Sequence, residues 1–335
     1  MNKSRTIQKA LITVPYQGWH WDKLAEAFAP AEIARVPHGD TERVLKEIED
    51  ADVAVLGGNI SDEMLAKAKK LKWVHCDMAG VNDSAKPEIF DRGIFLTASA
   101  GRSTQVLAEH TFFLMLSMTY ASRELEENQR NHVWKNIYVD RRGLYTKTVG
   151  VVGLGHTGCE VARIGKAFGM NVLGYSRRVP EHPEYFDGLF TEDRGETMET
   201  LLRESDFVVL AVRLSDETYH MIGDKEFSLM KPTAFLINMA RGAVVDEKAL
   251  VKALQDHTIA GCGSDVFEQE PLPSDSPLWD MPNMVITPHA TPEGPDLTAN
   301  SLEIICENIR RYREGEKLLY VLGKNDMYTA NSRHA

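Results

Sequence analysis

Long apolar runs and an excess of positive charge are both missing from this 335-residue chain. No eighteen consecutive residues are apolar, and the N-terminal stretch MNKSRTIQKALITV lacks the apolar core of a signal peptide. We therefore expect no membrane-spanning helix and a cytoplasmic protein. Lys and Arg number 38 against 49 Asp and Glu, for a net charge of −11. This balance argues against nucleic acid or an anionic membrane as a partner, but it does not exclude a local basic pocket.

Cysteine is scarce and unpaired. The four cysteines are scattered, with no CxxC pair and no metal-ligand spacing: Cys76, Cys159, Cys262 and Cys306. We interpret them as core or surface thiols in a reducing compartment and expect no metal site. The remaining composition, 43% hydrophobic and 26% charged, is typical of a globular protein, and the length suits two domains.

The first hundred residues alternate short apolar runs with amphipathic stretches. The apolar runs predict strands over 9–14, 32–37, 52–58, 71–77 and 94–100. Helices are expected over 21–29, 41–51 and 61–70, with Thr41 and Ser61 as N-caps of the last two. Such alternation is typical of a parallel sheet with helices on both faces.

A second α/β unit follows. A long helical pattern runs over 104–130, and its first half is apolar nearly all round. Strand–helix alternation then restarts at Thr148, with strands expected over 148–153, 171–177, 206–212, 233–239, 259–266 and 283–290. The last helix is expected over 295–316. Because no flexible tether separates the two units, we expect a ligand site in a cleft between packed domains.

The segment GLGHTG has the G-x-G-x-x-G spacing at Gly153, Gly155 and Gly158. It follows the apolar strand TVGVV and opens a helix, which is the context that a dinucleotide-binding turn requires. Gly153 permits the tight turn, Gly155 lets the backbone approach a pyrophosphate, and Gly158 allows close helix–strand packing. The alternative is a glycine-rich turn without a ligand.

The next strand ends in Ser176, Arg177 and Arg178 instead of the acidic residue that binds the ribose of NAD. A hydroxyl followed by two guanidinium groups suits the 2′-phosphate of NADP, because arginine matches phosphate oxygens. We therefore expect NADP(H) to be preferred, with NAD(H) as the other cofactor. The alternative is a solvated arginine pair at a strand end.

Three further polar residues each follow an apolar strand: Arg241, Glu270 and His289. Together they supply what reduction of a 2-oxo acid needs. Arginine binds the substrate carboxylate bidentately, histidine gives a proton to the developing alkoxide, and the carboxylate keeps the acid form of the imidazole available. Taken singly, each has an ordinary structural explanation, and His75 and His110 look like satisfied core histidines.

Four ordered segments, GLGHTG, INMARGAVVDEKAL, GSDVFEQEPLP and TPHA, resemble the D-specific 2-hydroxyacid dehydrogenases. The resemblance spans nearly the whole chain. It implies an α/β fold of two doubly wound parallel-sheet domains. A Rossmann cofactor domain (103–291) would be inserted into a split, flavodoxin-like substrate-binding domain (1–102 and 292–335).

The resemblance also implies roles for individual residues. Arg241, Glu270 and His289 would be the catalytic triad of an oxidoreductase acting on CH–OH donors. The backbone amides of Ala79 and Gly80 would help bind the substrate carboxylate. Asp265 would hold the nicotinamide carboxamide. The glycine turn and the strand ends would supply further cofactor contacts from His156, Thr157, Ala211, Met239 and Ala240.

Within the family, Ser176-Arg177-Arg178 is similar to the NADPH-using glyoxylate and hydroxypyruvate reductases, and members usually form homodimers through their cofactor domains. Two alternatives stay open: an NAD-linked dehydrogenase that oxidises a 2-hydroxy acid, and an NAD(H)-sensing corepressor that acts as a binding module. Turnover of 2-oxo acids distinguishes the enzyme from the corepressor.

The chain also departs from the family pattern. Ala290-Thr291-Pro292 replaces the usual residues after the histidine, Arg213 stands where proline is usual, and Asn82 where aspartate is common. The substrate side chain should depend on residues around 57–60 and Met78, with Trp134 and Tyr138 as further candidates.

Overall fold

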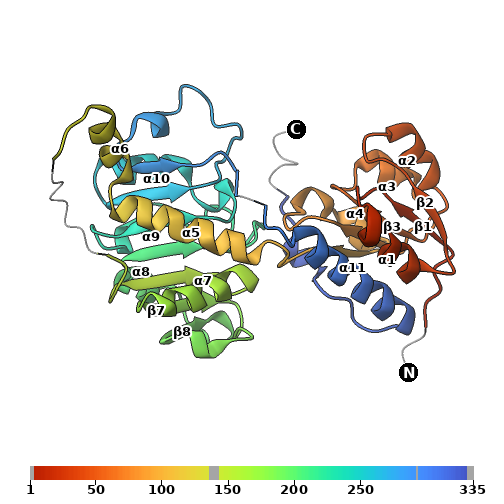
Figure 1. The fold of residues 1–335 in the computed structure, drawn as a ribbon. Coiled ribbons are helices and arrows are strands. Elements are labelled where there is room, and N and C mark those ends of the chain that lie inside the picture. Colours follow the sequence, from red (N-terminus) through yellow and green to blue (C-terminus); the bar gives the residue numbers. More distant parts are fainter. Residues whose placement is uncertain (1–3, 136–142, 292, 330–335) are drawn as a thin grey trace. The chain divides into compact units, whose positions relative to one another are not determined.

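The computed structural model describes residues 4–135, 143–291 and 293–329. The chain divides into two compact units, Met1–Ser103 with Gly294–Ala335 (unit 1) and Thr104–Glu293 (unit 2). The polypeptide therefore passes from unit 1 to unit 2 once and returns once (Figure 1). Over the described ranges, no helix has the length and apolar character needed to cross a membrane.

Unit 1 is built on a six-stranded sheet in the order β13-β5-β4-β3-β1-β2. Its strands are β1 (Lys9–Ile12), β2 (Glu32–Arg35), β3 (Val53–Leu56), β4 (Trp73–Cys76), β5 (Phe95–Ala98) and β13 (Val321–Leu322). The first five are parallel in the order 2-1-3-4-5, which is the flavodoxin-like order expected for this region. The short β13 was not expected; it pairs antiparallel with β5 at the edge.

The helices of unit 1 are α1 (Gly18–Phe28), α2 (Thr41–Glu47), α3 (Asp62–Lys67), α4 (Pro87–Asp91) and α11 (Leu297–Glu314). Ser61 caps α3 as predicted, accepting a hydrogen bond from the Met64 N–H at 3.1 Å. The prediction for α2 is wrong by one residue. Asp40, not Thr41, is the N-cap, because its carboxylate accepts from the Arg43 N–H and leaves Thr41 inside the helix.

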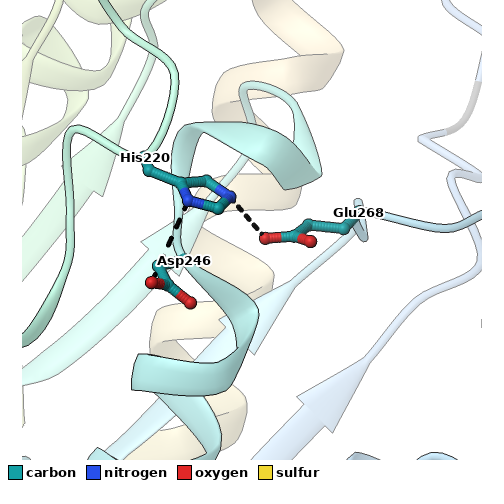
Figure 2. Close-up of side chains that lie close together, drawn as sticks. All are labelled: His220, Asp246 and Glu268. Carbon is teal, nitrogen blue, oxygen red and sulfur yellow. Dashed lines mark hydrogen bonds and ion pairs between the residues drawn. The ribbon is translucent and has the colours of Figure 1, made fainter. Parts of the chain in front are cut away.

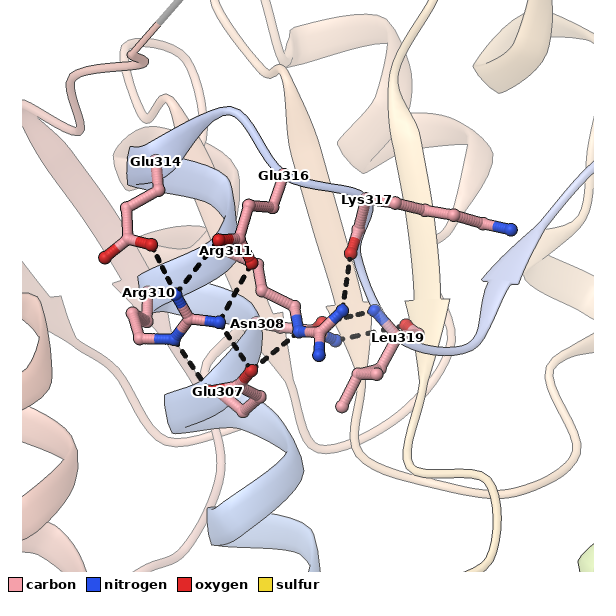
Figure 3. A network of polar contacts seen from close by, with 8 residues as sticks. All are labelled: Glu307, Asn308, Arg310, Arg311, Glu314, Glu316, Lys317 and Leu319. Carbon is pink, nitrogen blue, oxygen red and sulfur yellow. Dashed lines mark hydrogen bonds and ion pairs between the residues drawn. The ribbon is translucent and has the colours of Figure 1, made fainter. Parts of the chain in front are cut away.

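Two sets of polar contacts fix the end of α11 and the turn that follows it (Figure 3). Arg310 bonds three carboxylates, on Glu307, Glu314 and Glu316, and with Arg311 it lowers the pKa of Glu307 to about 2. These groups are largely exposed, so each pair contributes little to stability. The fully buried Asn308 contributes more, because its amide both donates to and accepts from the backbone of Leu319.

Unit 2 is built on a seven-stranded parallel sheet in the order β12-β11-β10-β9-β6-β7-β8. Its strands are β6 (Thr148–Val152), β7 (Asn171–Ser176), β8 (Gly188–Thr191), β9 (Phe207–Leu210), β10 (Phe235–Asn238), β11 (Gly261–Ser264) and β12 (Met284–Ile286). Counted from β6, the order is 3-2-1-4-5-6 with one added strand, which is the Rossmann order. The four-residue β8 at the edge was not expected.

The helices of unit 2 are α5 (Thr104–Thr119), α6 (Ser122–Arg130), α7 (His156–Ala167), α8 (Glu199–Glu204), α9 (Asp224–Leu229) and α10 (Glu247–Gln255). The continuous helical pattern expected over 104–130 is wrong at one point. Ala121 has φ 48°, in the left-handed region, and this residue ends the run between α5 and α6. The apolar α5 packs on α7 and on β10 and β11, which buries most of its circumference.

All four cysteines are free thiols in the structure. Cys76 and Cys262 lie in strands and are fully buried, and burial raises their thiol pKa to about 11 and about 12. A thiol with so high a pKa stays protonated at neutral pH and is a poor nucleophile or metal ligand. The interpretation of these cysteines as core thiols is confirmed.

Candidate active site

The register of the unit 2 sheet brings the polar residues expected from the sequence to one edge. Asn238 at the end of β10 pairs with Ser264 at the end of β11, which pairs with Ile286 at the end of β12. On the other side, Asn238 pairs with Leu210 of β9, which pairs with Val152 of β6. The strands therefore end level. The loops that follow them, including 153–155, 176–178, 239–241, 265–270 and 287–289, share the carboxyl edge of the sheet, where open α/β sheets bind ligands.

The glycine turn lies at the switch point of the strand order, between β6 and α7. Gly153 has φ 95°, and a Cβ on it would press against the backbone of Ala211 after β9. A Cβ on Gly158 would overlap the carbonyl oxygen of Gly153. Gly155 is the N-cap of α7 and offers no side chain to the first-turn amides, and a Cβ there would meet nothing within 4 Å. The turn thus leaves open space in front of a helix N-terminus, the arrangement that accepts a phosphate.

His289 and Glu270 are in direct contact. The Nδ1 of His289 lies 2.6 Å from Oε2 of Glu270, while Oε1 of Glu270 accepts from the Phe267 N–H at 2.9 Å. A carboxylate only accepts, so the proton of the neutral imidazole resides on Nδ1 and leaves Nε2 for proton exchange with a ligand. The His289 side chain is 49% exposed, so a ligand can reach it.

His289 has a strained backbone, with φ 50° in the left-handed region, and its loop is held by Asp265. The Asp265 carbonyl accepts from the His289 N–H at 2.8 Å. Its nearly buried carboxylate accepts from Thr287 Oγ1 at 2.6 Å, from the Ala290 N–H at 3.0 Å and from Thr291 Oγ1 at 3.0 Å. Asp265 is therefore the anchor of the His289 loop, a role that the sequence did not indicate.

His110 belongs to the same network. Its Nε2 lies 2.9 Å from Thr287 Oγ1. Since the Thr287 hydroxyl donates to Asp265, the His110 Nε2 must carry a proton and donate to Thr287. His110 is buried and hydrogen-bonded, as the sequence suggested. Its partner, however, lies two residues before His289, which only the folded chain reveals.

Arg241 follows β10 and is half-buried. Asn238 shapes its loop, because its side chain accepts from the Ala240 N–H and donates to the Arg241 carbonyl. A Cβ on the next residue, Gly242, would overlap the backbone of Phe267, so only glycine permits this approach. The Arg241 loop thus lies against the loop that carries Glu270, whose carboxylate accepts from the same Phe267.

Both arginines after β7 are exposed, and the Ser176 hydroxyl donates to the Arg178 carbonyl at 2.5 Å. Arg177 also has a partner that the sequence did not indicate. Its Nη1 lies 3.5 Å from a carboxylate oxygen of Glu217, in the loop after β9. Both side chains are more than half exposed, so this ion pair is weak.

A second cluster ties together the loops after β9, β10 and β11 (Figure 2). His220 donates its backbone N–H to the Ala243 carbonyl, and its Nε2 lies 2.7 Å from Oε1 of Glu268. Asp246 lies 3.9 Å from the Nδ1 of His220 and caps α10. One ring nitrogen of His220 and one carboxylate oxygen each of Asp246 and Glu268 lie within 4.8 Å of one another, a grouping that no spacing in the sequence indicates. The ring bridges two carboxylates, and Glu268 also accepts from the Glu247 N–H, so these bonds fix the loops around Arg241 and Glu270.

Ala79 and Gly80 lie in unit 1, in the turn after β4. Within the described residues, neither of their backbone N–H groups donates a hydrogen bond. Ala79 is exposed and Gly80 partly so. Two adjacent N–H groups without partners suit an anionic ligand such as a carboxylate.

The remaining expected residues are placed as follows. Ala211, Met239 and Ala240 lie just past β9 and β10, at the carboxyl edge of the unit 2 sheet. Thr291, one of the family departures, donates to Asp265, which gives this departure a structural role. Trp134 is fully exposed, and Tyr138 and Pro292 lie outside the described residues.

Residues 112–291 match the family of the D-isomer specific 2-hydroxyacid dehydrogenase, NAD binding domain. A glyoxylate reductase of Thermococcus litoralis is 37% identical over 306 residues, which is 88% of this chain and 90% of that protein. A D-isomer specific 2-hydroxyacid dehydrogenase family protein from Aeromonas salmonicida has a structure with TM-score 0.80 and 29% identity, covering 95% of this chain and 99% of that one.

An NADPH-dependent glyoxylate/hydroxypyruvate reductase from Sinorhizobium meliloti, solved with NADP and sulfate, has TM-score 0.78 and 25% identity, covering 95% of this chain and 98% of that one. The family match, the high coverage of both chains and the two sheet orders agree. The chain therefore belongs to the D-isomer specific 2-hydroxyacid dehydrogenases, oxidoreductases that act on CH–OH donors with a nicotinamide cofactor.

Proposed function

We propose that the protein reduces a small 2-oxo acid, of the glyoxylate and hydroxypyruvate class, to the D-2-hydroxy acid with NADPH. The observation that carries this proposal is the contact between His289 and Glu270 at the sheet edge that also holds the glycine turn. The similarity to glyoxylate reductases supports the substrate class. The proposal includes the cytoplasm as its compartment, in keeping with four free thiols.

The glycine turn fits a dinucleotide. Glycine is required at Gly153 and Gly158 by contacts within the protein itself, whereas the space at Gly155 is open. We assign the pyrophosphate to this turn, with His156 and Thr157 at the start of α7. The nicotinamide end would lie near Ala211, Met239, Ala240 and Asp265. Asp265 already accepts three hydrogen bonds to its carboxylate, so any contact to the carboxamide would use its remaining acceptor capacity.

The substrate carboxylate is assigned to Arg241 together with the amides of Ala79 and Gly80. Arginine matches a carboxylate bidentately, and the two N–H groups, which donate to no other residue that the structure describes, add neutral donors. In this proposal residues 1–102 and 292–335 form the substrate-binding domain, and residues 103–291 form the cofactor domain.

The chain's own contribution to the chemistry is a positioned proton. Reduced nicotinamide, when bound, supplies the hydride that the carbonyl carbon accepts. His289 gives the proton on Nε2 to the carbonyl oxygen, and Glu270 stabilises the protonated ring through Nδ1. Arg241 orients the oxo acid so that its oxygen meets the imidazole.

NADP is favoured by the residues after β7. Arg177 and Arg178 are exposed and adjacent, and no carboxylate follows β7 where an NAD site would have one. Glu217 pairs with Arg177 only weakly. The dianionic 2′-phosphate is a stronger partner for the arginine and would displace it.

The assembly is proposed to be a homodimer through unit 2. On α5 and the residue after it, Phe113 and Tyr120 expose about half of their large side chains. Leu125, Val133 and Trp134 add further exposed apolar surface nearby in the sequence.

We expect light scattering to give twice the chain mass of 37.6 kDa, and Phe113→Glu to lower that mass toward the monomer. A wild-type monomer at micromolar concentration would contradict the homodimer.

Two glycine substitutions separate cofactor contact from protein packing. Gly155→Ala should fold with an unchanged melting temperature, because its Cβ meets no protein atom, yet bind NADPH at least about tenfold more weakly. Gly158→Ala should lower the melting temperature as well, because its Cβ overlaps Gly153. Calorimetry and fluorescence titration measure both effects. Normal NADPH affinity in Gly155→Ala would show that no pyrophosphate approaches this turn.

The function itself is tested by turnover. We expect the purified chain to oxidise NADPH with glyoxylate or hydroxypyruvate, with a higher kcat/KM for NADPH than for NADH. Arg177→Ala/Arg178→Ala should lower the NADPH efficiency at least about tenfold and leave NADH nearly unchanged, since charge-assisted contacts are worth roughly 1.5–3 kcal/mol each. Arg203→Ala, an exposed arginine near the amino end of β9, is the control. If the wild type uses both cofactors equally well, Arg177 and Arg178 do not bind a 2′-phosphate and are only solvated residues at the end of a strand.

The pH profile tests His289 and Glu270. Reduction consumes the imidazolium proton, so the rate should fall as pH rises. Glu270→Gln removes the negative charge that stabilises the protonated ring, so the fall should move to lower pH and the rate at neutral pH should drop. The profile of kcat/KM between pH 5 and 9 measures this. An unmoved profile would make Glu270 a structural residue.

A further inference from the structure

A buried polar cluster in unit 1 surrounds Asp77, the residue directly after β4 and directly before Met78, Ala79 and Gly80. Asp77 is only 8% exposed. Its Oδ2 accepts from the Tyr16 hydroxyl at 2.9 Å, and its Oδ1 accepts from Ser99 Oγ at 2.8 Å and from Arg102 Nη1 at 3.1 Å. None of these side chains has a part in the chemistry described above.

Hydrogen bonds in this cluster run in one direction and end at Asp77. The indole N–H of Trp73 can only donate, and it donates to Thr97 Oγ1 at 2.8 Å. The Thr97 hydroxyl can then donate to Nδ1 of His75 at 2.9 Å, while Nε2 of His75 donates to Ser99 at 3.0 Å. Burial lowers the pKa of His75, so the ring is neutral and has one donor and one acceptor nitrogen. The last donor in the series, the Ser99 hydroxyl, donates to the Asp77 carboxylate.

The charges of the cluster are balanced. Arg102 is mostly buried and lies against Asp77, so the pair presents no net positive charge to an oxo acid. The Tyr16 hydroxyl stays protonated, because burial and the nearby Asp77 raise its pKa. A role in positioning therefore fits Arg102 better than a role as a second carboxylate-binding cation.

Arg102 and Ser99 of the cluster bond to backbone carbonyls in the turn that follows β4. Arg102 Nη1 donates to the Asp77 carbonyl at 2.6 Å, and the Ser99 N–H donates to the Met78 carbonyl at 3.1 Å. The next N–H groups, of Ala79 and Gly80, have no such contact within the described residues. The turn is thus fixed through the carbonyls of Asp77 and Met78, while the N–H groups of Ala79 and Gly80 donate to no described residue.

Arg102 also links the segment that leaves unit 1 to the segment that returns to it. Arg102 lies two residues before unit 2 begins, and its carbonyl accepts from Asn300 Nδ2 at 3.3 Å. Its Nη1 also lies 3.4 Å from Ser301 Oγ. Both partners belong to α11, the first helix after the chain returns to unit 1. The turn, the outgoing chain and the returning chain therefore share one set of hydrogen bonds.

We propose that Asp77 and Arg102 are positioning residues that hold the Ala79 and Gly80 amides in the orientation that binds the carboxylate of the oxo acid. This inference rests on the proposed function. A carboxylate is needed because three donors converge on it, one from Tyr16 after β1 and two from Ser99 and Arg102 after β5. An amide in its place has one acceptor oxygen, and its NH₂ group would face at least one donor.

The test compares substrate and cofactor constants in full-length variants. Asp77→Asn should raise the KM for glyoxylate roughly tenfold or more, since small displacements of a substrate-positioning group have effects of this size. The KM for NADPH should stay within about twofold. Tyr16→Phe removes one donor without changing shape and should give a smaller rise. Arg102→Lys should retain more oxo-acid affinity than Arg102→Met, because lysine can still donate to Asp77.

Asn308→Ala is the matched control. Asn308 is a fully buried polar residue of unit 1 whose side chain, in the part of the chain that the structure describes, bonds to Leu319 and to no residue of the Asp77 cluster, so its loss should lower the melting temperature without changing the KM for glyoxylate. If the Asp77 and Tyr16 variants move that KM no more than the control does, the cluster is merely structural and the inference is overturned. A wild-type chain inactive on every 2-oxo acid would instead overturn the proposed function, and this inference with it.

Discussion

The parallel register of the unit 2 sheet is the constraint on which the site depends. Because β6, β9, β10, β11 and β12 run in the same direction and end level, every loop that follows them emerges at one edge. Residues more than a hundred positions apart in sequence, such as Gly153 and His289, therefore belong to the same edge without any direct bond between them. Parallel strands also require crossover connections, and here these are the helices that cover the two faces.

That edge still needs local rigidity, and carboxylates supply it. Asp265 accepts from two hydroxyls and one backbone N–H while its own carbonyl accepts from His289. Hydrogen bonds to a charged group contribute about 1.5–3 kcal/mol each, so the three bonds to the Asp265 carboxylate together exceed the roughly 1–2 kcal/mol cost of the left-handed backbone at His289. The strained conformation is therefore stable, and it presents the imidazole to Glu270 at 2.6 Å.

Much of this architecture follows from sequence patterns, because hydrophobic runs and glycine spacing report local structure. A second α/β unit with a dinucleotide-binding turn was predictable from the restart of strand–helix alternation at Thr148 and from Gly153, Gly155 and Gly158, whereas the strand order itself comes from the structure. Local errors arose where neighbouring residues compete: Asp40 and Thr41 can both cap α2, and only the folded backbone decides between them. The break at Ala121 had no sequence signal, because neither glycine nor proline marks it.

Side-chain partners from distant segments were the least predictable part. Glu217 lies forty residues from Arg177 and meets it only because β9 and β7 flank β6. His220, Asp246 and Glu268 likewise come from three loops with no shared spacing. His75 and His110 illustrate the same limit, because the sequence identifies a buried histidine but not the network to which it belongs.

The two units apply one physical solution to two different turns. In unit 2, Asp265 follows β11 and fixes the loop of His289; in unit 1, Asp77 follows β4 and fixes the turn of Ala79 and Gly80. Both carboxylates are nearly buried, and each accepts three hydrogen bonds: Asp265 from the single loop that carries His289, and Asp77 from Tyr16 and from the segment after β5. A buried charge is stable only when several donors satisfy it, so its presence also holds those donors in place. An acidic residue directly after a buried parallel strand can therefore serve the site without touching a ligand, by holding the neighbouring groups in the orientation that ligand binding requires.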